Sequence, residues 1–399
     1  MAVRAQSSRL RRQLVRALED EGWIRSAPVR DAFLEVPREL FVPDFAKAQG
    51  LAAVYRDESI LIKQDLHGVP LSSSSQPAIM ASMLEQLRLE EGMRVLEIGA
   101  GTGYNAALLS LLVGRPGRVV SVEVDPEIAR KARQRLRAHG YEARVVVGDG
   151  REGFAALAPF DRIIVTASSR HVPIAWFEQL EPQGLVEAPL QLSSAGAQAI
   201  PLLRKAGRGF RSTAVICGGF MPLRTAGEEA AAPERERASL VAIDGSAGIG
   251  MPIQQLYGDA VKTLSAQAKR RLLSISLTDG RRRPLGLRAP SSALALFLSL
   301  ELPDRQLIFT LPRRGIGVIA RDGRSLALIE PPAGRGARTI SSLRALGGEE
   351  AGELLLRHVR EWDRRGRPSE SELAITVSYD ESGASRLTYR WLDDQARST

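Results

Sequence analysis

Cysteine, histidine and aromatic residues are scarce in this chain of 399 residues, which has one cysteine, four histidines and 5% aromatic residues. Cys217 lies in a run that predicts a strand, where we expect it to be a small buried residue. A single cysteine excludes an internal disulfide and a zinc site made of several thiolates. His67, His139, His171 and His358 are scattered, and no two of them have the spacing of metal ligands. We therefore expect no metal.

Long apolar runs are also missing. No uninterrupted apolar stretch reaches the roughly 18 residues that a membrane-spanning helix needs. The first four residues, MAVR, lack the apolar centre of a signal peptide and lead into a charged helical pattern. From these two absences we expect a cytoplasmic protein with no membrane partner. The length predicts two domains, and 44% hydrophobic with 25% charged residues is typical of a globular fold.

Positive charge is abundant, with a formal net charge of +9. A nucleic-acid partner is one interpretation, and an acidic peptide substrate is another. The basic residues form only short clusters, at 9–12, 269–271 and 281–283, and aromatic residues do not alternate with them. We therefore favour solvated surfaces over a nucleic-acid interface.

The most informative motif is a glycine-rich turn that joins an apolar run to a helical pattern. Residues 95–104 read VLEIGAGTGY, with Gly99, Gly101 and Gly103 in the spacing Gly-x-Gly-x-Gly, and Glu123 ends the next apolar run. Glycines let the backbone approach a nucleoside, and a carboxylate at that distance bonds ribose hydroxyls. Turns that wrap a pyrophosphate contain one residue more. The shorter form predicts a cofactor without phosphates, such as S-adenosylmethionine.

Asp149 extends the predicted cofactor site. It follows the third expected strand in the segment 147–150, VGDG, where a carboxylate can accept a hydrogen bond from the adenine amine. A simple Asp-Gly turn is the alternative interpretation. The residues predicted to bind the cofactor in and after the glycine-rich motif are Glu97, Gly99, Gly101, Gly103, Tyr104, Glu123, Val124, Asp149 and Gly150.

Strand and helix patterns alternate from residue 94 to about 190, which predicts parallel strands with crossover helices. The expected fold is α/β: a doubly wound, mostly parallel, seven-stranded sheet of the Rossmann-like class I methyltransferase type, followed by an α+β domain. Expected strands are 94–98, 118–123, 143–147, 161–166, 198–205 and 209–217, and expected helices are 7–25, 28–36, 76–88, 104–113, 126–138 and 173–180.

A change of composition divides the chain. Residues 224–239 lack apolar periodicity and predict a linker. It separates a methyltransferase domain over 1–223 from a C-terminal domain over 240–399. In that second domain we expect strands at 293–302, 306–311, 317–320, 326–329 and 374–379, and a helix at 348–364.

Residues from about 8 to 222 resemble the protein-L-isoaspartate (D-aspartate) O-methyltransferase family. The matching segments occur in the family's order and spacing, at 36–43 (VPRELFVP), 75–77 (SQP), 95–104, 148–150 and 164–167. The resemblance implies that Ser75 lies over the methyl group and orients the substrate carboxylate, and that Ser72, Ser73 and Ser74 line the cofactor. It also implies S-adenosylmethionine as cofactor and a peptide or protein bearing aspartate or isoaspartate as substrate.

A carboxylate acceptor suits the residues present. It is ionised at neutral pH, so the nucleophile needs no general base, and the positive sulfonium of the donor attracts it. The task of the enzyme is then to place oxygen and methyl in line. The next backbone nitrogen attacks the resulting ester, and the product is a succinimide (aspartimide).

Two departures from the family pattern affect the substrate. The family usually reads Pro-Ile-Gly-x-Gly-Gln-Thr-Ile-Ser-Gln-Pro, whereas residues 64–77 read QDLHGVPLSSSSQP. The extension from about residue 240 is the second departure. Both resemble the subgroup associated with ribosomally made peptides, in which the enzyme tailors a precursor and the extension would hold that precursor. We favour this peptide-tailoring role.

General protein repair of L-isoaspartate is the alternative that the same chemistry leaves open. A nucleic-acid methyltransferase is disfavoured, because no Asn- or Asp-Pro-Pro-aromatic loop follows the strand that ends at 166. A non-catalytic binding module is disfavoured by the intact cofactor motif. The sequence leaves open the oligomeric state and whether aspartate or isoaspartate is the acceptor.

Overall fold

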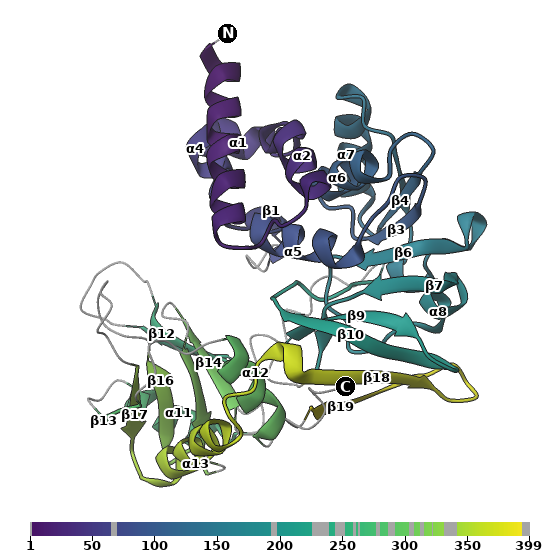
Figure 1. The fold of residues 1–399 in the computed structure, drawn as a ribbon. Coiled ribbons are helices and arrows are strands. Elements are labelled where there is room, and N and C mark those ends of the chain that lie inside the picture. The colour runs from purple at the N-terminus through teal and green to yellow at the C-terminus, as the bar shows by residue number, and fades with distance from the viewer. Residues whose placement is uncertain are drawn as a thin grey trace. The chain divides into compact units, whose positions relative to one another are not determined.

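The computed structural model describes residues 2–64, 70–192, 198–225, 239–243, 252–257, 261, 264–276, 280–285, 292–302, 307–311, 315–320, 322–330 and 341–392 (Figure 1). His67 and most of the expected linker lie outside these residues. The chain divides into two compact units. The first comprises Met1–Leu190, Ile200–Ala230 and Ala374–Arg390, and the second comprises Gln191–Ala199, Ala231–Leu373 and Trp391–Thr399.

The first unit begins with helices and continues as alternating strands and helices. Its elements are α1 (Ala2–Asp20), α2 (Ala27–Glu35), η1 (Arg38–Phe41), α3 (Pro43–Gln49), α4 (Leu51–Val54), β1 (Ile60–Gln64), β2 (Pro70–Ser74), α5 (Pro77–Leu87), β3 (Arg94–Ile98), α6 (Tyr104–Val113), β4 (Arg118–Glu123), α7 (Pro126–Ala138), β5 (Ala143–Val147), η2 (Gly150–Glu152), η3 (Ala155–Leu157), β6 (Phe160–Val165), α8 (Ile174–Glu178), β7 (Leu180–Glu187), β8 (Leu190–Gln191), β9 (Gln198–Lys205) and β10 (Gly209–Cys217), with β18 (Leu373–Tyr379) and β19 (Ser385–Trp391) from the C-terminal end.

A ten-stranded sheet forms the centre of this unit, in the order β19-β18-β10-β9-β7-β6-β3-β4-β5, with β8 beside β9. The neighbours β5, β4, β3, β6 and β7 are parallel, and β9 is antiparallel to β7. Parallel strands place their carboxyl ends along one edge, where α/β proteins bind ligands. The predicted α/β fold class is confirmed.

The sheet has more strands than the seven predicted. Strand β7 was not expected, because Pro182 and Gly184 interrupt its apolar pattern, and the helix expected over 173–180 is shorter, at Ile174–Glu178. The two-residue strand β8 and the C-terminal strands β18 and β19 are also additions. Helix α1 ends at Asp20 rather than at residue 25, and Gly22 follows with a positive φ of 79°.

Strands β18 and β19 extend the sheet of the first unit beyond β10, although the C-terminal domain was expected to include β18. Phe210 of β10 pairs antiparallel with Val377 of β18, which Figure 1 shows in yellow beside β10. The ring of Tyr379 lies 6.4 Å from that of Phe210 and 5.7 Å from that of Phe177. The added strand thus covers a sheet edge and its aromatic residues.

The core of the first unit lies between the sheet and its helices. Side chains of α1 and α2, such as Leu18 and Phe33, pack with residues of α5 and α6, such as Leu84 and Leu108. His139 ends α7 as predicted, and Cys217 is half-buried at the end of β10, rather than buried as expected. Among the described residues, no helix combines the length and apolar character needed to cross a membrane.

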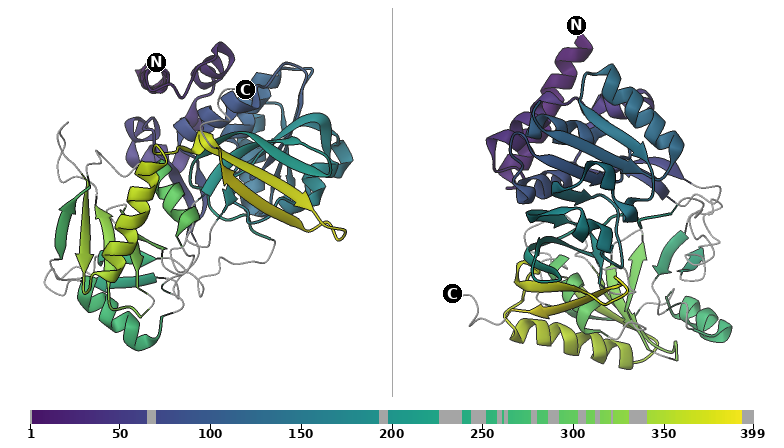
Figure 2. Two further views of the ribbon diagram at one scale, coloured as in Figure 1. Left: turned by 60° about the horizontal axis from the view of Figure 1, so that its bottom comes forward. Right: turned by 90° about the vertical axis from the view of Figure 1, so that its right-hand side faces the viewer.

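The second unit contains a seven-stranded antiparallel sheet, in the order β11-β12-β14-β15-β16-β17-β13 (Figure 2). Its elements are β11 (Ser239–Ile243), β12 (Pro252–Tyr257), α11 (Ala266–Ser276), β13 (Arg281–Pro284), α12 (Ser292–Glu301), β14 (Leu307–Leu311), β15 (Gly315–Ile319), β16 (Leu326–Glu330), β17 (Ser342–Leu346), α13 (Glu350–Arg364) and η4 (Glu370–Glu372).

Both faces of this sheet are covered. Leu326 and Leu328 of β16 pack in the cluster that includes Leu272 of α11, whereas Ala327 and Ile329 pack in the cluster that includes α12 and α13. Successive residues of a strand point to opposite faces. The continuous apolar run over 326–329 is therefore the pattern of a strand buried on both sides.

The strand predicted over 293–302 is wrong, because these residues form helix α12. Leu294, Phe297 and Leu298 are fully buried at helical spacing. Leu296 is buried too, so the run is apolar on most sides and its sequence shows neither the period of a helix nor that of a strand. Alanine and leucine, which favour helices, are the composition signal that distinguishes it.

Candidate active site

The turn from β3 to α6 is shaped by three glycines. Gly99, Gly101 and Gly103 have φ values of 98°, 51° and 87°, a region that residues with a Cβ rarely adopt. A Cβ on Gly99 would lie 2.5 Å from Oγ1 of Thr166. That hydroxyl donates to the carbonyls of Ile98 and Gly99, at 3.0 and 2.8 Å, and so joins the end of β6 to the turn.

Glu123 lies beside this turn at the end of β4, as predicted from the sequence. Its Oε2 accepts a hydrogen bond from the backbone N–H of Gly101 at 3.0 Å, and its Oε1 accepts one from Asp125 at 3.1 Å. Burial raises the pKa of this carboxyl, and the two amides act in the opposite direction. Glu123 therefore borders the glycine-rich turn, and the cofactor contacts expected for Glu123 and Val124 stay predictions.

Glu97 is fully buried in β3 and is bonded within the protein. It accepts hydrogen bonds from Nδ2 of Asn105, at 2.8 Å, and from the hydroxyl of Ser121. Burial raises the pKa of Glu97 to about 7. The carboxyl thus joins β3 to α6 and to β4. Its predicted contact with the cofactor stays a prediction.

Tyr104 opens α6, and its side chain faces the core. It is 3% exposed, and its ring packs against those of Phe33 and Phe41 at 6.3 and 5.7 Å. The backbone N–H of Tyr104 donates to Oγ1 of Thr102 at 3.3 Å. Tyr104 thus anchors the turn through its ring, and a contact with the cofactor would have to involve its backbone.

Asp149 and Gly150 follow β5 at the same edge of the sheet. Oδ1 of Asp149 accepts from the N–H of Arg151 at 2.9 Å, and Oδ2 forms an ion pair of 2.7 Å with the guanidinium of that residue. A Cβ on Gly150 would lie 2.3 Å from Cγ2 of Ile98, and the carbonyl of Gly150 accepts from Nε1 of Trp176 at 2.8 Å. The ends of β3 and β5 therefore meet closely.

The serine-rich segment forms strand β2, antiparallel to β1. A Cβ on Gly101 would lie 3.5 Å from the carbonyl oxygen of Ser73 and 4.0 Å from Oγ of Ser72, so β2 passes over the glycine-rich turn. Ser74 is two residues beyond Ser72, on the same face of the strand. It is 3% exposed, and within the described part of the chain its Oγ has no hydrogen-bond partner.

Ser75 follows β2 and is held through its backbone by Arg38. The guanidinium of Arg38 is fully buried and donates to the carbonyl oxygens of Ser75, Val54, Arg56 and Glu58, at 2.9, 3.0, 3.2 and 3.0 Å. Burial lowers the pKa of Arg38. Arg38 belongs to the segment VPRELFVP, but no role was predicted for it from the sequence.

Asp57 holds the same segment from the other side. Its Oδ2 accepts from Nε2 of Gln76 at 2.6 Å, and its Oδ1 accepts from the N–H of Ala78 at 2.8 Å. The second bond satisfies one of the free N–H groups in the first turn of α5. Arg38 and Asp57 together fix Ser75-Gln76-Pro77 where β2 enters α5. Asp57 was missed because nothing in its spacing marks it.

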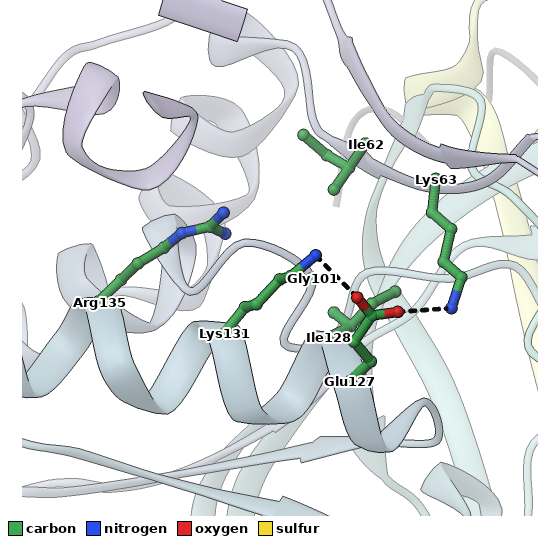
Figure 3. Close-up of a pocket in the computed structure, with 7 residues that line it drawn as sticks. All are labelled: Ile62, Lys63, Gly101, Glu127, Ile128, Lys131 and Arg135. Carbon is green, nitrogen blue, oxygen red and sulfur yellow. Dashed lines mark hydrogen bonds and ion pairs between the residues drawn. The ribbon is translucent and has the colours of Figure 1, made fainter. Parts of the chain in front are cut away.

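A small pocket of about 150 Å³ lies beside Gly101, between β1 and α7 (Figure 3). Figure 3 shows Glu127 between Lys63 and Lys131, with ion pairs of 3.3 and 2.9 Å. Lys63 also forms an ion pair of 2.7 Å with Asp125, the N-cap of α7. These bonds join strand β1 to the helix that follows Glu123. The residues that line the pocket are Ile62, Lys63, Gly101, Glu127, Ile128, Lys131 and Arg135.

The structure brings most of the predicted residues to one edge of the sheet. Glu123, Asp149 and the glycines lie at the carboxyl ends of β3, β4 and β5, and β2 covers the turn with its serines. His171 is exposed and contributes only backbone atoms to a bond with Ser169. Within the described residues, no group of three or more His, Cys, Asp or Glu is placed to hold a metal ion.

Comparison with known proteins identifies this arrangement. A model of the family described as protein-L-isoaspartate(D-aspartate) O-methyltransferase matches residues 8–226, more than half of the chain. The chain belongs to this family. Enzymes of the family are methyltransferases that take the methyl group from S-adenosylmethionine, so both the predicted reaction class and the predicted cofactor are confirmed.

Relatives of this methyltransferase match about half of the chain or nearly all of it. The protein-L-isoaspartate O-methyltransferase of Ignicoccus hospitalis is 37% identical over 214 residues, which are 53% of this chain and 96% of the relative. That of Hyperthermus butylicus is 43% identical over 189 residues, 45% of this chain and 74% of the relative. A solved structure of a protein-L-isoaspartate O-methyltransferase covers 95% of this chain and 99% of its own, with a TM-score of 0.53 and 26% identity.

The site of this methyltransferase fits its cofactor. Three glycines with positive φ leave the turn without side chains, Glu123 borders it, and Ser74 has a buried hydroxyl with no partner among the described residues. These features leave space beside the turn and provide a carboxylate and a hydroxyl, which a nucleoside with an amino-acid tail can bond. The individual contacts predicted for these residues remain predictions.

Proposed function

We propose that this methyltransferase transfers a methyl group to the free carboxylate of an isoaspartyl residue in a peptide or protein. The observation that carries the proposal is the position of Ser75-Gln76-Pro77. Arg38 and Asp57 fix this segment at the end of a strand that passes over the glycine-rich turn. The relatives named protein-L-isoaspartate O-methyltransferase support the choice of substrate.

The residues of the chain would act by positioning. The donor supplies an electrophilic methyl group on a positively charged sulfur. Glu123 and the glycine-rich turn hold the nucleoside, and the hydroxyl of Ser75 orients the acceptor carboxylate. That carboxylate is ionised at neutral pH, so no side chain has to remove a proton before the reaction. The rate then depends on how rigidly the Ser75 segment is held.

The ester that forms would lead to repair without further help from the enzyme. The backbone nitrogen of the next residue attacks the ester carbonyl, the C–O bond to the methoxyl group breaks, and methanol leaves. The product is a succinimide, which water opens to aspartate or isoaspartate. Repeated cycles would convert isoaspartate to aspartate.

Mass spectrometry with two matched peptides tests the proposal. The protein is incubated with S-adenosylmethionine and a peptide that contains isoaspartate at one position, and in parallel with the same peptide containing aspartate. We expect the mass of one methyl group to be added to the isoaspartyl peptide. Methylation of the aspartyl peptide alone would contradict this substrate assignment, and modification of neither would point to a dedicated substrate.

Tailoring of a ribosomally made peptide is the second proposal for the substrate. The observation that favours it is the sequence before Ser75, where the glycine-rich stretch usual in the family is lost and three more serines, Ser72, Ser73 and Ser74 of β2, appear. In this role an unmodified aspartate of a precursor would be methylated and closed to aspartimide, with the second unit holding the precursor. The C-terminal extension by itself is weaker support for tailoring, because the solved protein-L-isoaspartate O-methyltransferase aligns with 95% of this chain.

A comparison of substrates separates the two proposals. Unrelated isoaspartyl peptides of different sequence are each assayed at one concentration. Similar rates on all of them would support general repair. If none reacts while a peptide encoded beside this gene is methylated on aspartate and loses methanol, the chain is a tailoring enzyme.

A further inference from the structure

The segment that follows β10 returns across the carboxyl edge of the sheet. The N–H of Ser168, just after β6, donates to the carbonyl of Met221 at 2.7 Å, and the N–H of Leu223 donates back to Ser168 at 2.8 Å. Ser168 and Pro222 thereby form a parallel bridge. Residues 221–224 are thus attached to the end of β6 by backbone hydrogen bonds, and we call them the strap.

The strap reaches the predicted cofactor site on both sides. Cδ1 of Leu223 lies 3.4 Å from where a Cβ on Gly150 would be, at the end of β5. Nη2 of Arg224 donates to the carbonyl of Leu71 in β2 at 3.1 Å, one residue before Ser72. The strap therefore connects β5, β6 and the serine strand. The expected linker began at residue 224, so sequence reasoning missed the position of Arg224.

The guanidinium of Arg224 also acts on the acid at the end of β4. Its positive charge lowers the pKa of the Glu123 carboxyl, against the larger effect of burial. Arg224 is half-buried and contacts the strand that carries the serines. A guanidinium has five N–H donors. The one that is bonded to the carbonyl of Leu71 holds the Arg224 side chain in place.

Three other cations near the turn are held by contacts with structural groups. Arg38 is fully buried on four backbone carbonyls, Arg151 is paired with Asp149, and Lys63 is paired with Asp125. Both reactants of a carboxyl methyltransferase carry a carboxylate, one on the acceptor and one on the amino-acid part of the donor. A planar guanidinium group binds a carboxylate well, because two of its N–H groups can point at the two carboxylate oxygens.

We propose that Arg224 binds a reactant carboxylate in the active site, and so helps to select a charged acceptor or to anchor the donor. This rests on the proposed function, since the acceptor carboxylate belongs to it. A guanidinium in this place would favour the charged acceptor over its neutral methyl ester, which would help the product to leave. A guanidinium that contacted the acceptor oxygen too closely would make that oxygen a weaker nucleophile. We therefore expect substitution of Arg224 to change binding of the reactant rather than the chemical step.

The test uses Arg224→Gln and Arg224→Lys, with Arg208→Gln as control. Arg208 is exposed in the turn between β9 and β10, and its substitution removes the same charge at the opposite edge of the sheet. The first arm measures kcat and KM for an isoaspartyl peptide. The second measures by calorimetry the affinities for S-adenosylhomocysteine and for 5′-methylthioadenosine, which lacks the amino-acid part.

Two results support the proposal and identify which carboxylate is bound. If the acceptor is bound, Arg224→Gln raises the KM for the peptide about tenfold or more, leaves kcat within a few-fold, and leaves both nucleoside affinities unchanged. If the donor is bound, the affinity for S-adenosylhomocysteine falls and that for 5′-methylthioadenosine does not. In either case we expect Arg224→Lys to retain part of the wild-type affinity for the bound reactant. Arg208→Gln is expected to behave like the wild type.

Two results would overturn the proposal. Equal weakening of both nucleosides would mean that Arg224 only supports β2 through Leu71, and no change in any constant would mean that it binds neither reactant. If the wild type fails to methylate any isoaspartyl peptide, the proposed function fails instead. The calorimetric arm still tests the donor contact in that case, because it requires no turnover.

Discussion

The guanidinium of Arg38 donates a hydrogen bond of 2.9 Å to the backbone carbonyl of Ser75. Arg38 lies at the start of a 3-10 helix near the N-terminus, and Ser75 lies just before the helix that leads into the sheet. The bond is made to the backbone, so the hydroxyl of Ser75 is left to other partners. A buried cation thereby fixes the backbone of the residue predicted to orient the substrate.

Replacement of Arg38 tests this relationship. Arg38→Met leaves four backbone carbonyls without this donor, and we expect the free energy of unfolding to fall by roughly 3 kcal/mol or more. Arg38→Lys has three donors in place of five and is expected to be intermediate. Urea unfolding measures both. Arg30→Met, which removes an exposed pair with Asp31, is the control and is expected to leave stability nearly unchanged. Equal effects of Arg38→Met and Arg30→Met would contradict the assignment.

A second prediction concerns the glycine-rich turn. In Gly99→Ala the new Cβ would meet Oγ1 of Thr166 at 2.5 Å, and the positive φ of 98° adds strain. We expect binding of S-adenosylhomocysteine to be lost in calorimetry. Gly140→Ala has a positive φ of 76° and no atom within 4 Å of its Cβ, so it carries the strain without the clash. It should bind as the wild type does. Normal binding by Gly99→Ala would refute the close contact between β6 and the turn.

Lys63 is expected to affect cofactor binding through the position of β1. Its ion pairs with Asp125 and Glu127 join β1 to α7, and they raise the pKa of Lys63. Lys63→Met should weaken binding of S-adenosylhomocysteine by a factor of about 2 to 5, the range of a partly exposed pair. Arg130→Met removes an exposed charge of α7 outside the pocket and should leave the affinity unchanged. Equal affinities of the two variants would argue against a role for β1.

Glu187 predicts a pH dependence of stability. It is fully buried, its two oxygens have no hydrogen-bond partner within the described residues, and burial raises its pKa well above the usual range. A carboxyl that keeps its proton in the folded protein but loses it in the unfolded chain makes stability fall as pH rises above about 4.3, the ordinary pKa of glutamate. Glu187→Gln has a neutral side chain at every pH, so its stability does not fall with pH for this reason.

Thermal unfolding of the wild type and Glu187→Gln from pH 5 to pH 9 measures this effect. We expect similar Tm values at pH 5 and a variant that becomes relatively more stable with each pH unit, by at most about 1.4 kcal/mol per unit. The pKa of Glu97, raised to about 7, is common to both proteins and cancels from the difference. A difference in Tm that is independent of pH would show that Glu187 is ionised at pH 5.

Much of the first unit could be predicted because its patterns are local. The run 95–98 before Gly99 is buried between two parallel strands, and the glycine spacing indicates where the chain must turn. Arg38 and Asp57 could not be predicted in this way. Their partners are backbone carbonyls, a backbone N–H and an amide side chain that lie 16 or more residues away in the sequence. Such contacts leave no periodic signal.

Two errors have different physical causes. Residues 293–302 were predicted as a strand because burial on most sides removes the periodicity that distinguishes a helix. Arg224 was assigned to a linker because the charged and small residues beyond it dominate the composition of the window. Its hydrogen bond to Leu71 joins positions 153 residues apart, which only the fold brings together.

We propose that the Ser75 segment, held over the cofactor turn, serves transfer to a carboxylate. The chemical stability of the product tests this role most directly. The protein is given S-adenosylmethionine with a labelled methyl group and an isoaspartyl peptide, and the labelled peptide is then exposed to mild alkali. We expect release of the label as methanol, because a methyl ester is hydrolysed under these conditions. A label that stays on the peptide would mean transfer to nitrogen or sulfur and would contradict transfer to a carboxylate.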